Sequence, residues 1–227
     1  MKLTTGIATM TGLLVCGLSG ATTPQAEAGQ AAAKAETVKI ELGEGSRVSY
    51  RVAERLAGVD FGTEAVGITE AVTGMIVVRA DGSIDASQSK ISVDMRTFKS
   101  DQALRDLYLS SAVMNTGEFP TLEFVPSRAE GLPNPLPVGT PYEVNPAITI
   151  PSAVGFSLIG NMTWHGVTKE VTWSVVSTLL PDAAAGRATT SVTFDTFGLT
   201  KPAIPILASV DDTIRLELDF RATRSGM

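Results

Sequence analysis

The sequence predicts an all-β protein built on a single antiparallel, eight-stranded barrel with one or two short helices. Apolar and polar residues alternate along several short stretches, which is the period of a strand with one buried face. Tight turns that contain Gly, such as Asp81-Gly82 and His165-Gly166, join neighbouring stretches into hairpins. The 227 residues, 44% of them hydrophobic, suffice for one large core. A β-sandwich satisfies the same pattern, but only closure into a barrel removes the exposed edges of a sheet.

The clearest element is a hairpin over residues 155–176, which turns at His165-Gly166. Apolar side chains occupy alternate positions on both sides of the turn, and both tryptophans of the protein are among them. The apolar face of this hairpin carries Phe156, Leu158, Met162, Trp164, Val171, Trp173 and Val175. Because a two-stranded hairpin is not stable alone, other strands must cover this face.

Further segments alternate in the same way, and the last of them is the most regular in the chain. We expect strands over residues 47–56, 72–79, 89–97, 121–125, 188–197 and 213–223. Tyr50, Phe194 and Phe220 fall on the apolar faces of three of these strands. Residues 58–69 contain three glycines and are of mixed polarity, which predicts a loop.

Two segments interrupt the strand pattern. Residues 101–111 carry leucines and a tyrosine at helical spacing, which predicts a short helix. The charged face of this helix, formed by Asp101, Arg105 and Asp106, is expected to be solvated or to cap the helix. Residues 131–151 contain six prolines, which forbid a regular helix or a central strand. We therefore expect a long Pro-rich surface insert there.

Residues 1–28 have the pattern of a secretory signal peptide. Lys2 is followed by an apolar run, and Ala26-Glu27-Ala28 provides a cleavage site, with Ala21 as an alternative. The protein is therefore expected to be periplasmic or secreted. The only cysteine, Cys16, lies inside the apolar run, and a lipid anchor attached to it is the less favoured alternative. Cleavage after residue 28 leaves no thiol, which excludes Cys-dependent catalysis and Cys-ligated zinc.

The remainder is expected to comprise a flexible leader over residues 29–46 and one barrel domain over residues 47–227. The formal net charge is −6 and no basic residues cluster, so nucleic acid is not an expected partner. No stretch predicts a stable membrane span once the signal is removed, since a span needs about 20 apolar residues. The sequence leaves the oligomeric state open, a homodimer included.

Three segments resemble the YceI-like family of exported, lipocalin-like proteins. The first, over residues 105–124, reads R-D-L-Y-L-S-S-A-V-M-N-T-G-E-F-P-T-L-E-F. The second is the hairpin G-N-M-T-W-H-G-V-T-K-E-V-T, and the third is F-G-L-T-K-P followed by D-D-T-I-R-L-E-L-D-F. This chain departs from the family at Tyr108 and Ser110, where the family usually carries a His and an Arg.

The resemblance implies a hollow barrel that binds an isoprenoid lipid and performs no catalysis. A prenyl chain gains about 0.8 kcal/mol for each CH₂-sized unit that it buries, so an apolar tunnel needs no charged anchor. No metal and no cofactor other than this lipid is implied. The candidate ligand-binding residues are Tyr50, Phe156, Leu158, Met162, Trp164, Trp173, Phe194 and Phe220. The lipid itself remains open between a polyprenyl quinone, a prenyl phosphate, a carotenoid and a fatty amide, and its purpose between transport, storage and protection.

Two other classes of function are compatible with the sequence. A barrel filled by its own side chains would serve as a scaffold that meets a protein partner through the Pro-rich insert. A small hydrolase would need His165, the only histidine, as its base, but no G-x-S-x-G motif supplies a nucleophile. A histidine in a hairpin turn is more often solvated, so the hydrolase is the least favoured interpretation.

Overall fold

A computed structural model describes residues 37–133, 141–145, 148–151 and 153–226, with backbone only for residues 141–145 and 148–151. The strands of the main sheet are β1 (Val38–Leu42), β2 (Arg47–Leu56), β3 (Thr63–Thr69), β4 (Val72–Val78), β5 (Lys90–Asp94), β6 (Thr121–Glu130), β9 (Ala153–Trp164), β10 (Val167–Leu179), β11 (Ala183–Thr193), β12 (Leu207–Val210) and β13 (Thr213–Gly226). The helix α1 (Ala103–Tyr108) continues into a wider π-type turn, Leu109–Val113. Two 3-10 turns, Met95–Thr97 and Asp195–Phe197, complete the elements of this sheet.

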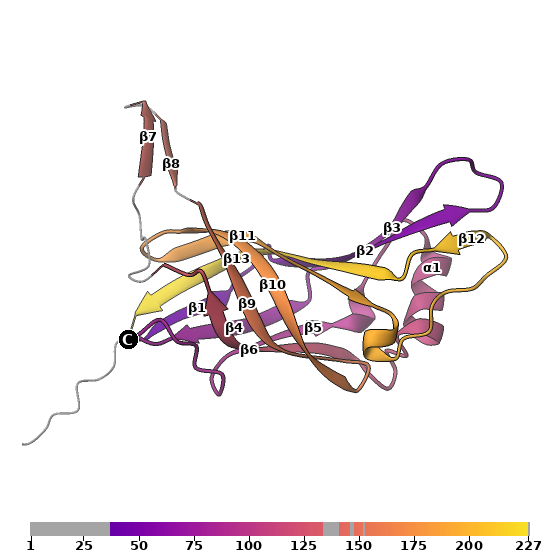
Figure 1. The fold of residues 1–227 in the computed structure, drawn as a ribbon, viewed down its shortest axis with the longest axis horizontal. Helices are drawn as coiled ribbons and strands as arrows, with labels where there is room; N and C mark the ends of the chain where they lie inside the picture. The colour runs from indigo at the N-terminus through magenta and orange to yellow at the C-terminus, as the bar shows by residue number, and fades with distance from the viewer. Residues whose placement is uncertain (1–36, 134–140, 146–147, 152, 227) are drawn as a thin grey trace, which may run out of the picture. The chain divides into compact units, whose positions relative to one another are not determined.

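Eight strands form a closed antiparallel barrel. Their order around the ring is β1, β4, β5, β6, β9, β10, β11 and β13, and pairing of β13 with β1 closes it. Figure 1 shows these strands wrapped around a common interior. The predicted fold class, an all-β antiparallel barrel of eight strands, is therefore confirmed, and the β-sandwich is excluded.

Two walls of the barrel are long bent strands that break in the middle. In one of them, β1 is followed by β2, and in the neighbouring one, β3 is followed by β4. The two long strands lie side by side, because β1 pairs with β4 and β2 pairs with β3. At the first break, the Ser46 hydroxyl donates to the Arg221 carbonyl (3.0 Å) and accepts from the Arg221 N–H (3.1 Å). A side chain thus replaces the missing backbone partner, which keeps buried polar groups satisfied at the bend.

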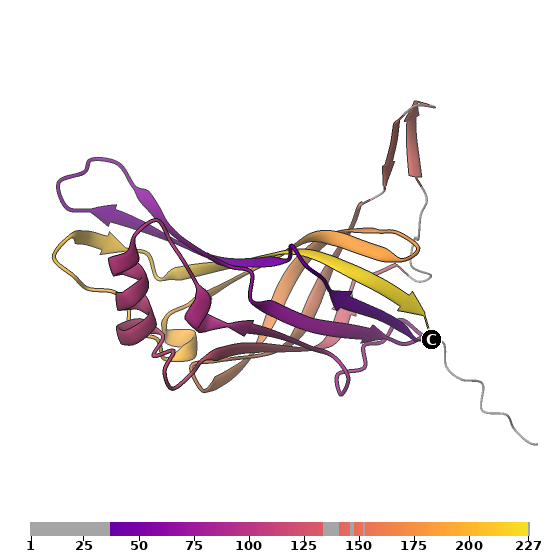
Figure 2. The ribbon, with the colours of Figure 1, turned by 180° about the vertical axis from the view of Figure 1, so that it is seen from behind.

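The bend separates the barrel into two ends. Figures 1 and 2 both show α1 at the same end as β12 and the turn between β2 and β3. β12 pairs with the last residues of β2 and extends the sheet at this end. The ends of β1 and β13 lie at the opposite end of the barrel.

Two expectations about the N-terminal third of the barrel are wrong. The loop predicted over residues 58–69 is in part the strand β3, whose inward residues are the small Ala65, Gly67 and Thr69. Its larger apolar side chains face outward, which hides the usual alternation of apolar and polar residues. The flexible leader predicted over residues 29–46 is wrong where β1 forms, because Val38–Leu42 alternates and pairs on both sides.

Other predicted elements are confirmed, with shifted ends. β9 and β10 form the central hairpin, and Trp164 pairs with Val167 across the two-residue turn. His165 (φ 52°) and Gly166 (φ 75°) are both left-handed, as a type I′ turn requires. The helix predicted over residues 101–111 is α1 with its π-type turn. The strand expected over residues 89–97 ends early, because the Asp94 side chain caps the following 3-10 turn.

The Pro-rich insert contains a small element of its own. β7 (Pro141–Asn145) and β8 (Ile148–Pro151) pair with each other in a separate two-stranded sheet. The short strand β12 was not expected, because the prolines before it predict a loop. The expected signal peptide lies outside the described residues.

Candidate apolar binding site

The interior of the barrel contains two apolar cavities. The larger, with a volume of about 410 Å³, lies beside α1, and we call it the helix-side chamber. The smaller, about 110 Å³, occupies the other end of the barrel, and we call it the far chamber. The interior is therefore not filled by the protein's own side chains, which is unusual given the close packing of ordinary protein cores.

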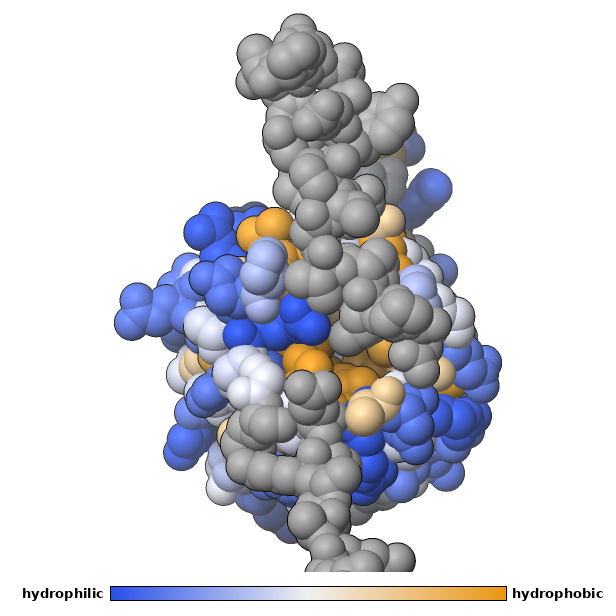
Figure 3. Space-filling model, turned by 90° about the vertical axis from the view of Figure 1, so that its left-hand side faces the viewer, coloured by the Kyte–Doolittle hydropathy of each residue, from blue (hydrophilic) through white to orange (hydrophobic). Residues whose placement is uncertain are grey.

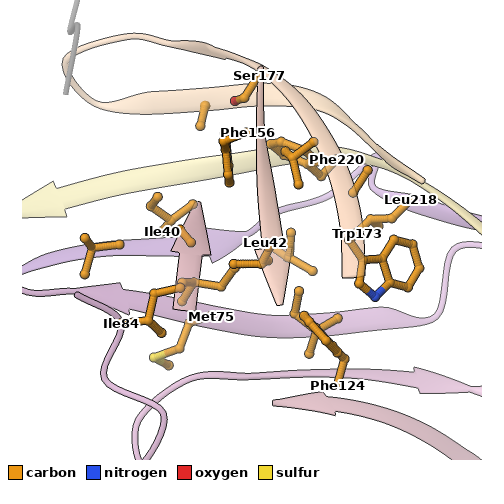
Figure 4. A pocket seen from close by; sticks show the side chains of 18 of the residues that line it. Ile40, Leu42, Met75, Ile84, Phe124, Phe156, Trp173, Ser177, Leu218 and Phe220 are labelled. Atoms are coloured by element: carbon orange, nitrogen blue, oxygen red, sulfur yellow. The ribbon is translucent and has the colours of Figure 1, made fainter. Parts of the chain in front are cut away.

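Aliphatic and aromatic side chains form almost the whole wall of the far chamber, as Figure 4 shows. They come from β1, β2, β4, β5, β6, β9, β10, β11 and β13, and include Ile40, Leu42, Met75, Phe124, Phe156, Trp173, Leu218 and Phe220. Among the described residues, Ser177 contributes the one hydroxyl in this wall, and that hydroxyl donates to the Ala185 carbonyl (3.3 Å). Figure 3 views this end of the barrel and shows apolar residues at its centre with hydrophilic residues around them.

The helix-side chamber combines apolar walls with a polar border. Its apolar lining includes Val52, Met95, Phe98, Met114, Trp164, Phe194, Leu199 and Ile214. Its polar lining comes from Tyr50, Glu54, Gln102, Arg105 and Tyr108. Two apolar residues of the same lining, Leu104 (82% exposed) and Ile206 (61% exposed), reach the outer surface. The apolar wall thus continues from the interior to the outside at this end.

Charged side chains hold α1 over the helix-side chamber. Arg105 donates to Glu54 of β2 (3.0 Å) and to Asp101 (2.5 Å), and the Glu54 side chain is only 7% exposed. Asp106 accepts hydrogen bonds from the Ser100 N–H (2.9 Å) and hydroxyl (2.6 Å). The charged face expected to be solvated or capping therefore ties α1 to its surroundings: Arg105 pairs with β2, and Asp106 bonds the segment before the helix, while the N-cap residue Gln102 makes no side-chain cap hydrogen bond.

Tyr50 stands between the polar border and the apolar interior. Its ring packs against Phe98, with the ring centroids 5.4 Å apart, and covers Gly67 of the neighbouring strand. Burial, and secondarily the negative charge of Asp106, raise the pKa of the Tyr50 hydroxyl to about 12. The hydroxyl is therefore neutral at physiological pH.

Seven of the eight predicted ligand-binding residues line a chamber. Tyr50, Trp164 and Phe194 line the helix-side chamber. The far chamber is lined by Phe156, Leu158, Trp173 and Phe220. The eighth, Met162, is wholly buried and lines neither, because it packs in the core where β9 meets β6. A role in binding remains a prediction for each residue.

The two tryptophans lie in different chambers, Trp164 beside the helix and Trp173 in the far chamber. Both indole N–H groups are buried and have no hydrogen-bond acceptor among the described residues. A buried indole N–H normally finds a partner, so each tryptophan keeps a donor that an acceptor from outside the described residues could satisfy. Each chamber is thus lined by one tryptophan.

Sequence analysis missed several residues of the site. The far chamber takes Ile40 and Leu42 from β1 and Met75 from β4. The alternation of Val38–Leu42 was visible but fell within the segment expected to be a leader. Glu54 and Arg105 carried no signal, because an ion pair between β2 and α1 depends on how the helix crosses the barrel end.

The alternative to a lipid site was a hydrolase site with His165 as its base. His165 is half-buried in the hairpin turn, and its ring packs against Phe119 at a centroid distance of 4.5 Å. Within the described ranges, no three His, Cys, Asp or Glu side chains are grouped so that they could share a metal ion. No helix in the part of the chain that the structure describes is long and apolar enough to cross a bilayer.

The fold and its hollow interior define a class of protein: a β-barrel with an internal apolar cavity. The YceI-like domain family matches residues 33–222, so the chain belongs to this family, as the three sequence segments suggested. None of the curated proteins matches the chain in sequence.

Solved structures share the fold at low sequence identity. A polyisoprenoid-binding domain from Saccharophagus degradans, implicated in plant cell wall breakdown, superposes with a TM-score of 0.60 at 8% identity, covering 82% of this chain and 98% of that one. BcnA from Burkholderia cenocepacia superposes with a TM-score of 0.53 at 14% identity, covering 79% and 96% of the two chains. At these identities the similarity extends to the fold alone.

Proposed function

We propose that the protein binds a lipid with an isoprenoid chain inside the barrel and performs no catalytic step. The observation that supports this most strongly is the pair of apolar chambers within one closed barrel. Pockets that take small ligands are typically ~300–1,000 Å³ and mostly apolar, and the helix-side chamber falls within that range at about 410 Å³. A barrel filled by its own side chains, the scaffold alternative, would not contain these chambers.

The distribution of polar groups orients the proposed lipid. Far from α1 the part of the wall that the structure describes offers one hydroxyl, which is already hydrogen-bonded, so a hydrocarbon chain suits that end. Beside α1, Tyr50, Gln102 and Tyr108 place hydroxyl and amide groups at the border of the chamber. A polar end group is therefore expected at the helix side, and the chain is expected to extend inward from there.

The lipid is expected to enter the barrel at the end beside α1. Leu104 and Ile206 are exposed and also line the helix-side chamber, so a lipid chain can move inward along apolar surface. We include entry beside α1 in the proposed function. The Saccharophagus degradans domain of the same fold is described as polyisoprenoid-binding, which agrees with an isoprenoid as the ligand class.

Organic extraction of the purified protein, followed by mass spectrometry of the extract, tests the ligand class. We expect prenyl lipids to be enriched relative to a matched extract from an unrelated protein that was purified in the same way. Fatty acids or phospholipids in place of prenyl lipids would contradict the isoprenoid assignment. Failure of the delipidated protein to bind any prenyl alcohol would contradict the function itself.

We also propose that the protein is exported after cleavage of residues 1–28. The basic start, apolar run and Ala26-Glu27-Ala28 site support this. N-terminal sequencing of the protein recovered from the periplasm or the medium should begin at Gly29. A protein retained in the cytosol with residue 1 intact would contradict export, and a lipid on Cys16 would favour the anchored alternative.

A further inference from the structure

The two chambers are separated by four aliphatic side chains. Val48, Val93, Leu122 and Leu216 are the residues that line both cavities. All four are buried, and no more than 5% of the surface of any of these residues is exposed. They therefore form the shared boundary between the helix-side chamber and the far chamber.

These four residues come from opposite walls of the barrel. Val48 lies on β2 and Leu216 on β13, which are paired strands. Val93 on β5 is in register with Leu122 on β6. Around the ring, β5 and β6 are separated from β13 by several strands on either side, so the two pairs face each other across the interior. They form a constriction rather than a continuous patch on one wall.

We propose that this constriction selects ligands by the length of their hydrocarbon chain and makes the far chamber a second subsite for the end of a long prenyl chain. Short chains remain in the helix-side chamber, and longer chains pass between the four side chains. The inference rests on the proposed function, which supplies the ligand class.

The types of side chain in the constriction suit this role. Val48 and Val93 are β-branched and hold one χ1 rotamer strongly, whereas leucines change rotamer at lower cost. Each wall of the constriction therefore carries one valine with a restricted rotamer and one leucine that can change rotamer. Leu122 and Leu216 can turn aside for a chain without any displacement of the strands.

The tryptophans report separately on the two chambers. Trp173→Phe leaves Trp164 as the reporter of the helix-side chamber, and Trp164→Phe leaves Trp173 as the reporter of the far chamber. We would titrate each delipidated single-tryptophan protein with geraniol, farnesol and geranylgeraniol, which lengthen by one isoprene unit at each step. Geraniol should alter only the Trp164 emission, and geranylgeraniol should alter the emission of both tryptophans.

Substitutions in the constriction should change this pattern in opposite directions. Val93→Phe narrows the passage and should raise the Kd of geranylgeraniol about tenfold or more, because several CH₂-sized groups lose their burial. The same change should raise the Kd of geraniol by a clearly smaller factor, because Val93 also lines the helix-side chamber but geraniol does not have to pass the constriction. Leu216→Ala, on the opposite wall, widens the passage and should let geraniol alter the Trp173 emission.

Val192→Ala is the control, since Val192 is also a buried residue of the barrel core but lines neither chamber. It should preserve the dependence on chain length. Equal responses of both tryptophans to geraniol and geranylgeraniol would overturn the constriction, as would equal loss of both affinities in Val93→Phe. If Val93→Phe does not fold, silence of Trp173 towards geraniol in Leu216→Ala overturns it. Absence of binding by every alcohol would instead overturn the proposed function, and the subsite with it.

Discussion

Tyr50 shows how one buried side chain links the interior of the barrel to pH. The folded state keeps the pKa of Tyr50 at about 12, whereas an exposed tyrosine in the unfolded chain has a pKa of about 10. Below about pH 10 both states are protonated and stability is unaffected. Above it, the unfolded chain loses the proton first, so stability falls as the pH rises towards about 12.

We therefore expect the wild-type protein to lose about 2 to 3 kcal/mol between about pH 10 and about pH 12 from this residue alone. Tyr50→Phe removes the titrating group and should lose correspondingly less over the same interval. Urea unfolding of both proteins across this range measures the difference. Parallel curves would show that the tyrosine is not buried as described.

Gly67 is the partner that allows Tyr50 to adopt this position. A Cβ atom at residue 67 would lie 2.2 Å from the Tyr50 Cε1 atom, well inside contact distance. Gly67→Ala should therefore destabilise the protein by about 1–3 kcal/mol, the usual cost of overpacking. Gly155→Ala is the control, because the nearest atom to its Cβ, the Val175 carbonyl oxygen, is 4.0 Å away. Equal unfolding midpoints for the two variants would contradict the close contact.

Individual residues of the site were predictable where they lie on strongly alternating strands. Trp164 and Trp173 follow from period two alone, and the structure places one in each chamber. Met162 has the same pattern but packs into the wall, because alternation identifies the inward face and not whether space remains there. Gly67 offers no such pattern, since its contact is with a ring on the neighbouring strand.

At the scale of elements, the bend between β1 and β2 depends on one hydroxyl. Ser46 is 2% exposed and satisfies both the N–H and the carbonyl group of Arg221. Ser46→Ala should cost about 1–3 kcal/mol, because the Arg221 N–H loses its hydrogen-bond acceptor, although the Arg221 carbonyl still accepts from the Gly43 N–H (2.7 Å). Ser174→Ala, at an exposed position of β10, should change stability by less than about 0.5 kcal/mol. Chemical denaturation of the two variants provides the comparison, and similar losses would contradict a structural role for Ser46.

The helix α1 should depend on the ion pair between Arg105 and Glu54. Glu54→Gln leaves the Arg105 charge without its least exposed partner and should destabilise the protein by about 1–3 kcal/mol. The expected loss is smaller than for a fully buried pair, because the Arg105 side chain is 22% exposed. Asp101→Asn removes the other partner, which is 73% exposed, and should cost less than about 1 kcal/mol.

Hydrogen exchange of the α1 amides gives a second measurement for the same pair. Glu54→Gln should increase exchange in α1 while leaving the central hairpin protected, because the pair joins the helix to β2. Uniform loss of protection in both elements would show that the pair supports the barrel as a whole instead.

A strand was predictable where the hydrophobicity of its two faces differed strongly. β13 and the central hairpin have large apolar residues on one face and polar residues on the other, and both were found. β3 has small residues inside and apolar residues outside, so its pattern resembles a loop. β12 is four residues long and owes its existence to the end of β2, which no local pattern reveals.

For the whole molecule, a bound lipid should contribute to stability. A ligand that binds only the folded state stabilises it by about 2.7 kcal/mol when its free concentration is about 100 times its Kd. Delipidated protein should therefore unfold at a lower temperature than protein as purified. Added geranylgeraniol should restore the transition in proportion to the logarithm of its concentration, whereas detergent alone should not. A Tm that is unaffected by either treatment would contradict an internal binding site.

The barrel was predictable from the pattern of the residues, whereas its hollow interior was predicted only through the family resemblance. Strand number, alternation and the cost of open edges favour a closed sheet, and the family segments agree with it. Whether side chains fill the interior depends on their sizes at each level of the ring, which involves residues from many strands. The chambers are therefore a property that only the assembled molecule has.

The pairing of β1 with β13 also determines when the ring can close. Val38 lies opposite Gly226, so the seam joins the two most distant strands of the described chain. A ribosome has to complete nearly all of this chain before the seam can form. Until then β1 and β11 each present an unpaired edge, the kind of surface on which neighbouring nascent chains associate. A chain that ends shortly before residue 213 would thus form an open sheet with edges prone to aggregation, and not a smaller barrel.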